Sequence, residues 1–498
     1  MERCSGILMP IFSLPSKYGM GSFGQEGYEF VDFLYKSGQK IWQILPLVQT
    51  GFGNSPYSSV ASDSFNPYFI SVEQLKNEGL LTDAEIRFDK NHGKYIDYKD
   101  LHAVRYPLLR KAFARFNRND WTFRTYTQKG EALDYALFMA IKYATGQIPF
   151  YEWDEGLKRR DRSALAEFMR DYKEEILFWQ FVQFKAKEQW LRLKNYANKK
   201  GVKIMGDMPL YVALDSVDVW KNPELFKLDE NFAPKKVAGV PPDYFCEDGQ
   251  LWGNPVYDYS VHEKDGFSWW KKRLNKALHV FDYVRIDHFR GLDRYFEIDA
   301  DKENAKEGEW IDVPSKELFD QIHKDISSDR IIAEDLGIID EGVRDLLKYT
   351  GYPGMKILSF AFNGDEGNLY LPEKIEENSV CYTGTHDNDT LKGLIQSADE
   401  WDKNNLVLGV EKSLKKFGIS ADTSTCDGLC DAIIELGFAS KANAFIIPYQ
   451  DVLRCDGEYR VNVPGVVKDN NWAIRFNRAD FTRAACEKLK ALTVKYDR

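Results

Sequence analysis

The chain has 498 residues, a net charge of −10, 44% hydrophobic residues and 29% charged residues. This balance is typical of a globular protein and excludes disorder, collagen and coiled coil as descriptions of the whole chain. The negative charge argues against nucleic acid or a membrane surface as a partner, because either would require a basic patch.

Targeting signals and disulfides are not expected either. No apolar run reaches the roughly 18–20 residues that a membrane span requires. The N-terminal MERCSGILMP has no basic flank followed by an apolar stretch, so no signal peptide is predicted. The seven cysteines are an odd number without a CxxC pair, which favours a reducing compartment. We therefore expect a cytoplasmic protein, whose oligomeric state is not readable from the sequence.

Apolar strands alternate with helical patterns along most of the chain. The first strand is expected at 6–10, followed by a helix over 25–37 and a buried strand at 41–47. Six further strands are expected at 202–210, 280–289, 330–336, 355–362, 380–387 and 444–450. Near-continuous apolar strands that alternate with helices are typical of parallel strands buried on both faces. Eight of them predict an α/β fold, a (β/α)8 TIM barrel.

Two long gaps interrupt this alternation. The stretch between Leu47 and Val202 is too long for a loop and contains helical patterns, so it predicts a large, mostly helical insertion. The stretch from Asp215 to Trp269 is rich in Pro, Gly and aromatic residues, which predicts an inserted aromatic loop or lid. No β-sandwich is expected after the eighth strand. The predicted domains are 1–67, 176–214 and 271–498 for the barrel, 68–175 for the helical subdomain and 215–270 for the lid.

Carboxylates follow four of the predicted strands. In such a barrel, catalytic groups project from the C-terminal ends of the strands. A single aspartate there often only caps the next helix, but a fold has no structural need to gather several carboxylates, which repel each other. The pattern therefore predicts an active site at this rim. Its members are Asp207, Asp287, Glu334 with Asp335, and Asp387 with Asp389.

The strand YVRIDHF is the most informative, because Arg285 and Asp287 are two residues apart and point to the same side. The guanidinium is expected to keep Asp287 ionised, as a nucleophile requires; a buried pair that only fills the barrel is the alternative. A nearby Glu334 would then have a raised pKa, as a general acid requires. This pairing is typical of glycoside hydrolysis and transfer.

The segment GTHDNDT places His386 beside Asp387, where the two could bind vicinal sugar hydroxyls. His386 alone is equally consistent with a structural histidine. His288 follows Asp287 directly, so strand alternation predicts that it faces the opposite side and is structural.

These motifs together resemble those of the 4-α-glucanotransferases, the amylomaltase or disproportionating-enzyme family of the α-amylase superfamily. The resemblance rests on VRIDHFRG, AEDLG, TGTHDNDT and GDMPLYVALDSVDVW. It extends to SGILMPIFSLPSKYGMGSFG, WQILPL, NSPYSSVASDSFNPY, VPPDYF, GQLWGNPVY and RVNVPG, and is weakest between about residues 75 and 170. It thus spans nearly the whole chain.

The resemblance implies a role for each site residue. Asp287 matches the family's nucleophile, Glu334 its acid/base, and Asp387 the third carboxylate, which grips the donor sugar. The substrate-binding positions that it implies are Tyr57, Asp207, Asp215, Tyr244, Phe245, Trp252, Arg285, His386 and Asn462.

The implied reaction is the retaining transfer of an α-1,4-glucan segment from a maltooligosaccharide or glucan to the 4-hydroxyl of glucose or a glucan. It requires no cofactor and no metal, and neither a P-loop nor a GxGxxG motif after a strand occurs. NSPYSS lacks the acidic residue and Gln that many relatives carry around SPY, and Ser16 stands where many have Gly. These departures bear on subsite preference.

Three alternatives remain at this stage. The carboxylates and His386 could hold Mg²⁺ or Mn²⁺, in which case a chelator would abolish activity. A glucan-binding protein without catalysis would keep the aromatic residues but would not need Glu334. An α-glucan hydrolase on the same fold would share all three carboxylates and differ only in the access of water.

Overall fold

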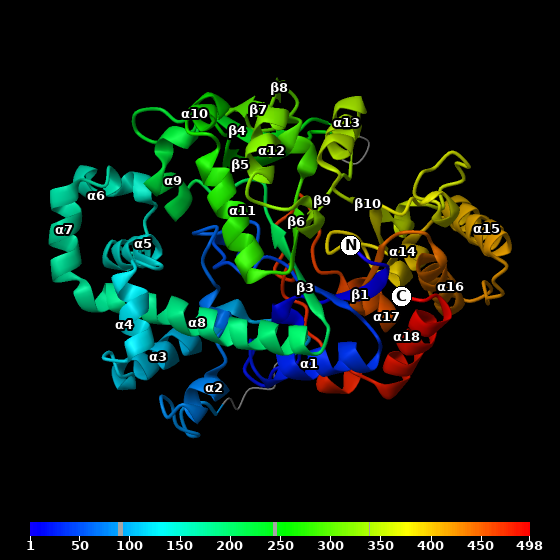
Figure 1. Ribbon diagram of the computed structural model, residues 1–498, viewed down its shortest axis with the longest axis horizontal. Helices are drawn as coiled ribbons and strands as arrows, with labels where there is room; N and C mark the ends of the chain where they lie inside the picture. The colour runs from blue at the N-terminus through cyan, green and yellow to red at the C-terminus, as the bar shows by residue number, and fades with distance from the viewer. Residues whose placement is uncertain (88–92, 243–246, 338) are drawn as a thin grey trace.

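The computed structural model describes residues 1–87, 93–242, 247–337 and 339–498. In this part of the chain, eight parallel strands form one sheet in the order β10-β11-β12-β1-β2-β3-β6-β9. Its end strands meet where the Ala333 N–H donates to the Pro353 carbonyl at 3.0 Å, so the sheet curls into a barrel (Figure 1). The strands are β1 (Cys4–Leu8), β2 (Ile41–Gln43), β3 (Lys203–Met208), β6 (Tyr283–Ile286), β9 (Ile331–Ala333), β10 (Gly354–Ile357), β11 (Ser379–Tyr382) and β12 (Ala444–Pro448). The predicted (β/α)8 barrel is confirmed.

Burial on both faces explains why these strands read as continuous apolar runs. Every residue of β1, β2, β11 and β12 is buried. The inward side chains form a compact cluster that includes Leu8, Met205 and Ile446. The strands are shorter than predicted at the end that faces the carboxylates. The predicted strand at 280–289, for example, ends at Ile286, and a turn follows at His288. At its other end, the helix α11 (Ser268–Val280) takes up the first predicted residue.

Helices surround the barrel and follow most of its strands. The helix α13 (Glu341–Thr350) illustrates how the local sequence forms such a helix. Asp340 caps its first turn, Val343 and Leu346 are buried, and Gly351 ends it at a φ of 69°. The helices of this layer are α1 (Gln25–Lys36), α8 (Lys173–Lys199), α11 (Ser268–Val280), α12 (Ser315–His323), α13 (Glu341–Thr350), α14 (Leu391–Ser397), α15 (Glu400–Phe417), α16 (Cys426–Ala439), α17 (Tyr449–Val452) and α18 (Arg483–Lys495).

Further helices lie between β2 and β3 in the chain, on one side of the barrel (Figure 1). They are α2 (Val72–Asn77), α3 (Tyr98–Arg115), α4 (Trp121–Gln128), α5 (Leu133–Ala144), α6 (Glu155–Lys158) and α7 (Arg162–Asp171). The helix α5 packs on the long helix α8, which in turn packs on β3 and α1. The ring of Phe138 on α5 lies 5.3 Å from Trp153 and 5.7 Å from Trp220. This aromatic packing joins α5 to the short helix α9 (Val217–Lys221), which follows β3.

A second sheet stands beside the barrel and differs from the sequence prediction. It is antiparallel, in the order β5-β4-β7-β8, with β4 (Lys236–Val240), β5 (Gln250–Pro255), β7 (Arg294–Asp299) and β8 (Glu309–Asp312). The predicted aromatic loop after β3 therefore contains strands, and β4 pairs with a strand that follows β6. The sequence did not reveal this because the pairing joins two separate insertions.

Within the part of the chain that the structure describes, no helix combines the length and apolarity needed to cross a membrane.

Candidate active site

The predicted carboxylates lie at the C-terminal rim of the barrel. Asp207 lies on β3, Asp287 directly follows β6, and Glu334 directly follows β9. These three strands are neighbours in the sheet. Because all barrel strands are parallel, their carboxyl ends meet at one rim, and the first three side chains gather there. Asp387 joins them from the loop between β11 and α14.

Arg285 links two of these carboxylates. Its side chain is 3% exposed, and its Nη1 donates to both oxygens of Asp207 at 3.0 Å and to Oδ1 of Asp287 at 2.7 Å. Asp207 also accepts a hydrogen bond of 2.7 Å from the hydroxyl of Tyr57, and its side chain is 0% exposed. Asp207 can therefore act on a substrate only through Tyr57 and Arg285, which it orients.

Two main-chain N–H groups hold Glu334. Its Oε2 accepts from the N–H of His288 at 2.7 Å and its Oε1 from the N–H of Leu336 at 2.9 Å. His288 has a φ of 50°, in the left-handed region, so the chain turns sharply after β6. Strand alternation stops at that turn. His288 is expected from the sequence to face the opposite side of the strand, but because of this turn its main-chain N–H points to Glu334.

Burial raises the pKa of Asp287 to about 7 and that of Glu334 to about 8. The positive charge of Arg285 opposes the rise in both, while the charge of Asp287 adds to the rise at Glu334. The raised pKa of Glu334 agrees with the sequence prediction. The lowered pKa expected for Asp287 does not occur, because desolvation outweighs the positive charge of Arg285, which is shared with Asp207, and the charge of Asp207 adds to the rise.

A second group of side chains lies beside this pair. The rings of Tyr57 and His386 are stacked, with centroids 5.2 Å apart and planes at 13°. The Nε2 of His386 lies 3.3 Å from Oδ2 of Asp387, and Nδ2 of Asn462 donates to Oδ1 of Asp387 at 2.6 Å. Burial lowers the pKa of His386, so the imidazole is neutral at pH 7. Asp387 remains 41% exposed and can still contact a ligand.

Asp215 is engaged elsewhere. Its Oδ2 accepts from Nζ of Lys142 at 2.5 Å, and its Oδ1 accepts from the N–H of Phe150 at 3.0 Å. Both partners belong to the helical insertion, so Asp215 joins that insertion to the segment after β3. None of these contacts reaches Asp287 or Glu334.

Trp252 reaches the site from β5. Its ring lies 4.9 Å from the ring of His288, nearly perpendicular, and 6.1 Å from the ring of Tyr211. Tyr244 and Phe245, implied as neighbours on the same lid, lie outside the described residues.

The sequence reasoning missed Trp472. Its ring centroid lies 5.6 Å from that of Tyr57 and 5.8 Å from that of His386, so Trp472 packs against both rings of the stacked pair. Trp472 belongs to no strand or helix and to none of the motifs quoted above. Only its place in three dimensions identifies it.

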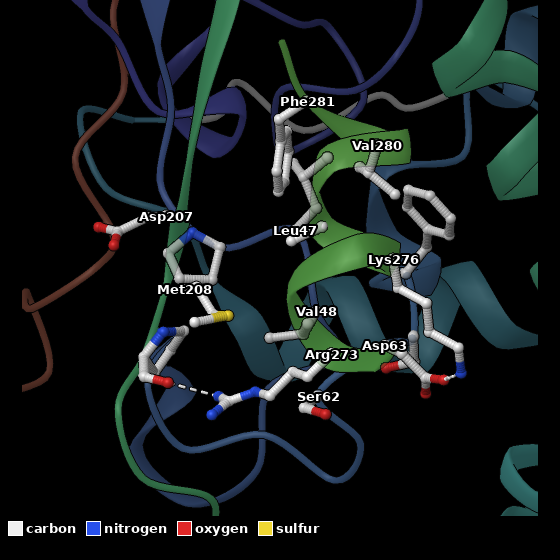
Figure 2. Close-up of a pocket in the computed structure, with 15 residues that line it drawn as sticks. Leu47, Val48, Ser62, Asp63, Asp207, Met208, Arg273, Lys276, Val280 and Phe281 are labelled. Carbon is white, nitrogen blue, oxygen red and sulfur yellow. Dashed lines mark hydrogen bonds and ion pairs between the residues drawn. The ribbon is translucent and has the colours of Figure 1, made fainter. Parts of the chain in front are cut away.

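A cavity of about 60 Å³ opens on the other side of β3 (Figure 2). Met208, Val280 and Phe281 line it, while the carboxylate of Asp207 points away from it. Ligand pockets for small molecules usually measure about 300 Å³ or more, so this cavity is too small for a sugar. The carboxylate rim is therefore the candidate site.

Metal binding at the rim is poorly supported by its charges. Among the described residues, no group of three or more His, Cys, Asp or Glu side chains is arranged to hold a metal ion. Arg285 already stands between two of the carboxylates, and a cation placed there would be repelled by it. The arrangement offers instead two neighbouring carboxyls with raised pKa values, which suits acid–base and nucleophilic chemistry.

Comparisons with known proteins show the family to which the chain is similar. Residues 9–481 match the family described as 4-alpha-glucanotransferase. A 4-alpha-glucanotransferase of Clostridium butyricum is 42% identical, over 98% of this chain and 100% of its own. One of Synechocystis sp. is 41% identical, over 96% of this chain and 94% of its own.

Solved structures give the same result. An amylomaltase from Streptococcus agalactiae, in complex with acarbose, superposes with a TM-score of 0.93 at 38% identity and covers 100% of both chains. An amylomaltase from Corynebacterium glutamicum, at 19% identity, has a TM-score of 0.80 over 100% of this chain and 75% of its own, which shows the fold alone.

Proposed function

This chain belongs to the 4-alpha-glucanotransferase family, and from that premise we propose that it transfers glucan segments through a covalent intermediate on Asp287. The donor is an α-1,4-glucan or maltooligosaccharide, and the acceptor is the 4-hydroxyl of glucose or of another glucan. The observation that carries the proposal is the pair of carboxyls directly after β6 and β9: the partly buried Asp287, bound by Arg285, and the buried Glu334, bound by two main-chain N–H groups.

The reaction proceeds in two displacements. The carboxylate of Asp287 attacks the anomeric carbon, while Glu334 gives its proton to the leaving glycosidic oxygen. Glu334, now ionised, then takes the proton of the acceptor 4-hydroxyl, whose oxygen attacks the same carbon and releases Asp287. Two inversions restore the α configuration. The mechanism requires the two carboxyl groups to stand about 5–5.5 Å apart, as in retaining glycosidases.

The neighbouring side chains suit the donor sugar. The stacked rings of Tyr57 and His386 offer a flat surface, and Asp387 presents a carboxylate that can accept hydrogen bonds from sugar hydroxyls. Asn462 holds that carboxylate in place. That a similar amylomaltase, from Streptococcus agalactiae, was solved in complex with acarbose supports the binding of a glucan by this chain.

Transfer requires that the acceptor outcompete water. Water is present at about 55 M, whereas a well-oriented group reaches an effective molarity of about 10⁵ M or more. We infer that Trp252, on the sheet beside the barrel, covers the acceptor side. A hydrolase would leave the acceptor side of the site open to water. Transfer and hydrolysis are therefore distinguished by their products.

The test is incubation with maltotriose alone, followed by separation of the products. Transfer predicts glucose and a ladder of longer maltooligosaccharides with little gain in reducing ends. Conversion to glucose and maltose, with reducing ends rising in step, would show a hydrolase. Trp252→Ala, compared with wild type, should increase the hydrolysed fraction.

Two matched substitutions test the roles of the carboxyls. Asp287→Asn should abolish turnover and preserve glucan binding, because the neutral amide cannot attack the anomeric carbon. Glu334→Gln should fail with ordinary glucans yet still consume an activated aryl glycoside, whose leaving group needs no proton. Full activity of either variant on maltotriose contradicts its assigned role.

A further inference from the structure

Asp451 is a buried carboxylate that the proposed chemistry leaves unused. It lies in α17, directly after β12, and is 2% exposed. Its Oδ2 accepts from the hydroxyl of Thr383 at 2.6 Å, and its Oδ1 accepts from the N–H of Leu391 at 2.8 Å. Thr383 directly follows β11 and Leu391 begins α14. One carboxylate therefore holds both ends of the loop that carries Asp387.

The loop between those ends is also ordered from within. The N–H and the hydroxyl of Thr385 both donate to Oδ1 of Asn388, at 2.8 and 2.9 Å. The N–H of Asp387 donates to the hydroxyl of Thr385 at 3.2 Å. With both ends fixed by Asp451, these bonds leave the backbone at Asp387 little freedom.

The opposite side of the loop is held by another segment. Arg460 donates to the carbonyl of Asp387 at 2.6 Å, and Asn462 donates to its carboxylate. These contacts act on Asp387 itself, whereas Asp451 acts on the loop ends. Asp387 is thus braced from both sides although its carboxylate is 41% exposed.

Burying a carboxylate at this depth costs desolvation free energy. Burial raises the pKa of Asp451 to about 6, and the hydrogen bonds from Thr383 and Leu391 oppose that rise. An apolar side chain would fill the same space without the desolvation penalty, but it could not accept two hydrogen bonds from separate points of the chain.

We propose that Asp451 is a positioning residue, which fixes both ends of the loop from Thr383 to Leu391 and so places the carboxylate of Asp387 for the donor sugar. This inference rests on the function proposed above. No motif quoted from the sequence includes Asp451.

Three variants test the inference through maltotriose kinetics and thermal unfolding. Asp451→Ala removes both hydrogen bonds and should lower kcat on the order of 10²-fold with a smaller change in KM, because misplacement by about 1 Å costs that much. Thr383→Val removes one bond and should lower kcat less. Asp451→Asn should stay within about threefold of wild type, since its oxygen can accept from Leu391 and its amide can donate to Thr383.

Glu26→Ala is the matched control. Glu26 is also buried, and it accepts from the N–H and hydroxyl of Ser22, far from the loop in the chain. It should lower the melting temperature without lowering the kcat of the folded enzyme. A wild-type kcat for folded Asp451→Ala overturns the inference, and if that variant does not fold, a wild-type kcat for Thr383→Val overturns it.

The double variant Asp387→Ala/Asp451→Ala separates the two proposals. If Asp451 acts through Asp387, its removal should cost less than about threefold once Asp387 is absent, measured with an activated donor. A further loss of the order of 10²-fold in this background overturns the inference alone. An unchanged kcat for Asp387→Ala overturns the proposed function of Asp387, and with it the inference.

Discussion

At the scale of single residues, burial decides the chemistry of the rim more than charge pairing does. Arg285 lies 2.7 Å from Asp287, yet burial raises the pKa of Asp287, and the charge of Asp207, which binds the same nitrogen, adds to that rise. A motif that places arginine beside aspartate therefore does not by itself determine which carboxyl is ionised. The number of carboxylates that share the guanidinium has to be known.

The two pKa values predict the pH dependence of kcat/KM. Asp287 must be ionised to attack, so activity should rise as the pH rises through about 7. Glu334 must be protonated to assist the leaving group, so activity should fall as the pH rises through about 8. Initial rates on maltotriose from pH 5 to 10 measure this bell-shaped profile.

Glu334→Gln provides the control for this profile. With an activated donor, whose departure needs no proton, the variant should lose the fall in rate at high pH and keep the rise near pH 7. A fall that persists unchanged in this variant assigns the alkaline limb to another group.

At the scale of elements, the approach of β3 to α11 depends on a glycine. A Cβ added at Gly206 would lie 2.2 Å from ring atoms of Phe281, which follows α11. Such a contact cannot form without moving the ring or the strand. The strand that carries Asp207 is therefore held by close packing on its outer side.

Gly206→Ala should lower the free energy of unfolding by about 1–3 kcal/mol, as overpacking of a core does. Urea denaturation measures the change. Gly93→Ala is the control, because nothing lies within 4 Å of its added Cβ. Equal stability of the two variants would show that Phe281 yields freely. The Gly206 variant should also lose activity, because Asp207 is the next residue.

At the scale of the whole molecule, contacts near the two ends of the chain help to close the barrel. The guanidinium of Arg498 donates to main-chain carbonyls that include those of Cys4 at 3.1 Å, Phe438 at 2.7 Å and Ala442 at 3.0 Å. Cys4 begins β1, Phe438 lies near the end of α16, and Ala442 lies between α16 and β12. Figure 1 shows β1 and α18 on the same side of the barrel.

Arg498→Met should therefore lower the free energy of unfolding by about 2 kcal/mol or more, since it removes several hydrogen bonds from a buried charged donor to main-chain carbonyls. Arg483→Met is the control, because Arg483 is 91% exposed and pairs with Glu487 at the surface. That variant should stay within about 0.5 kcal/mol of wild type. An Arg498 variant of wild-type stability contradicts the proposed closure.

The sequence by itself determined the barrel and the family of this protein. The eight apolar segments and the short motifs after them are local patterns of the sequence, so they can be recognised without knowing how the chain folds. The rim that gathers Asp207, Asp287 and Glu334 follows from them, because parallel strands align their carboxyl ends.

Only the tertiary structure decided how those residues interact. The burial of Asp207, the shared guanidinium of Arg285 and the support of Tyr57 by Trp472 depend on segments far apart in the chain. The pairing of β4 with β7 also joins segments far apart in the chain, and so does the hydrogen bonding of Asp451 to the loop that carries Asp387. Pairings and pKa values of this kind arise from burial and distance, and no local pattern encodes either.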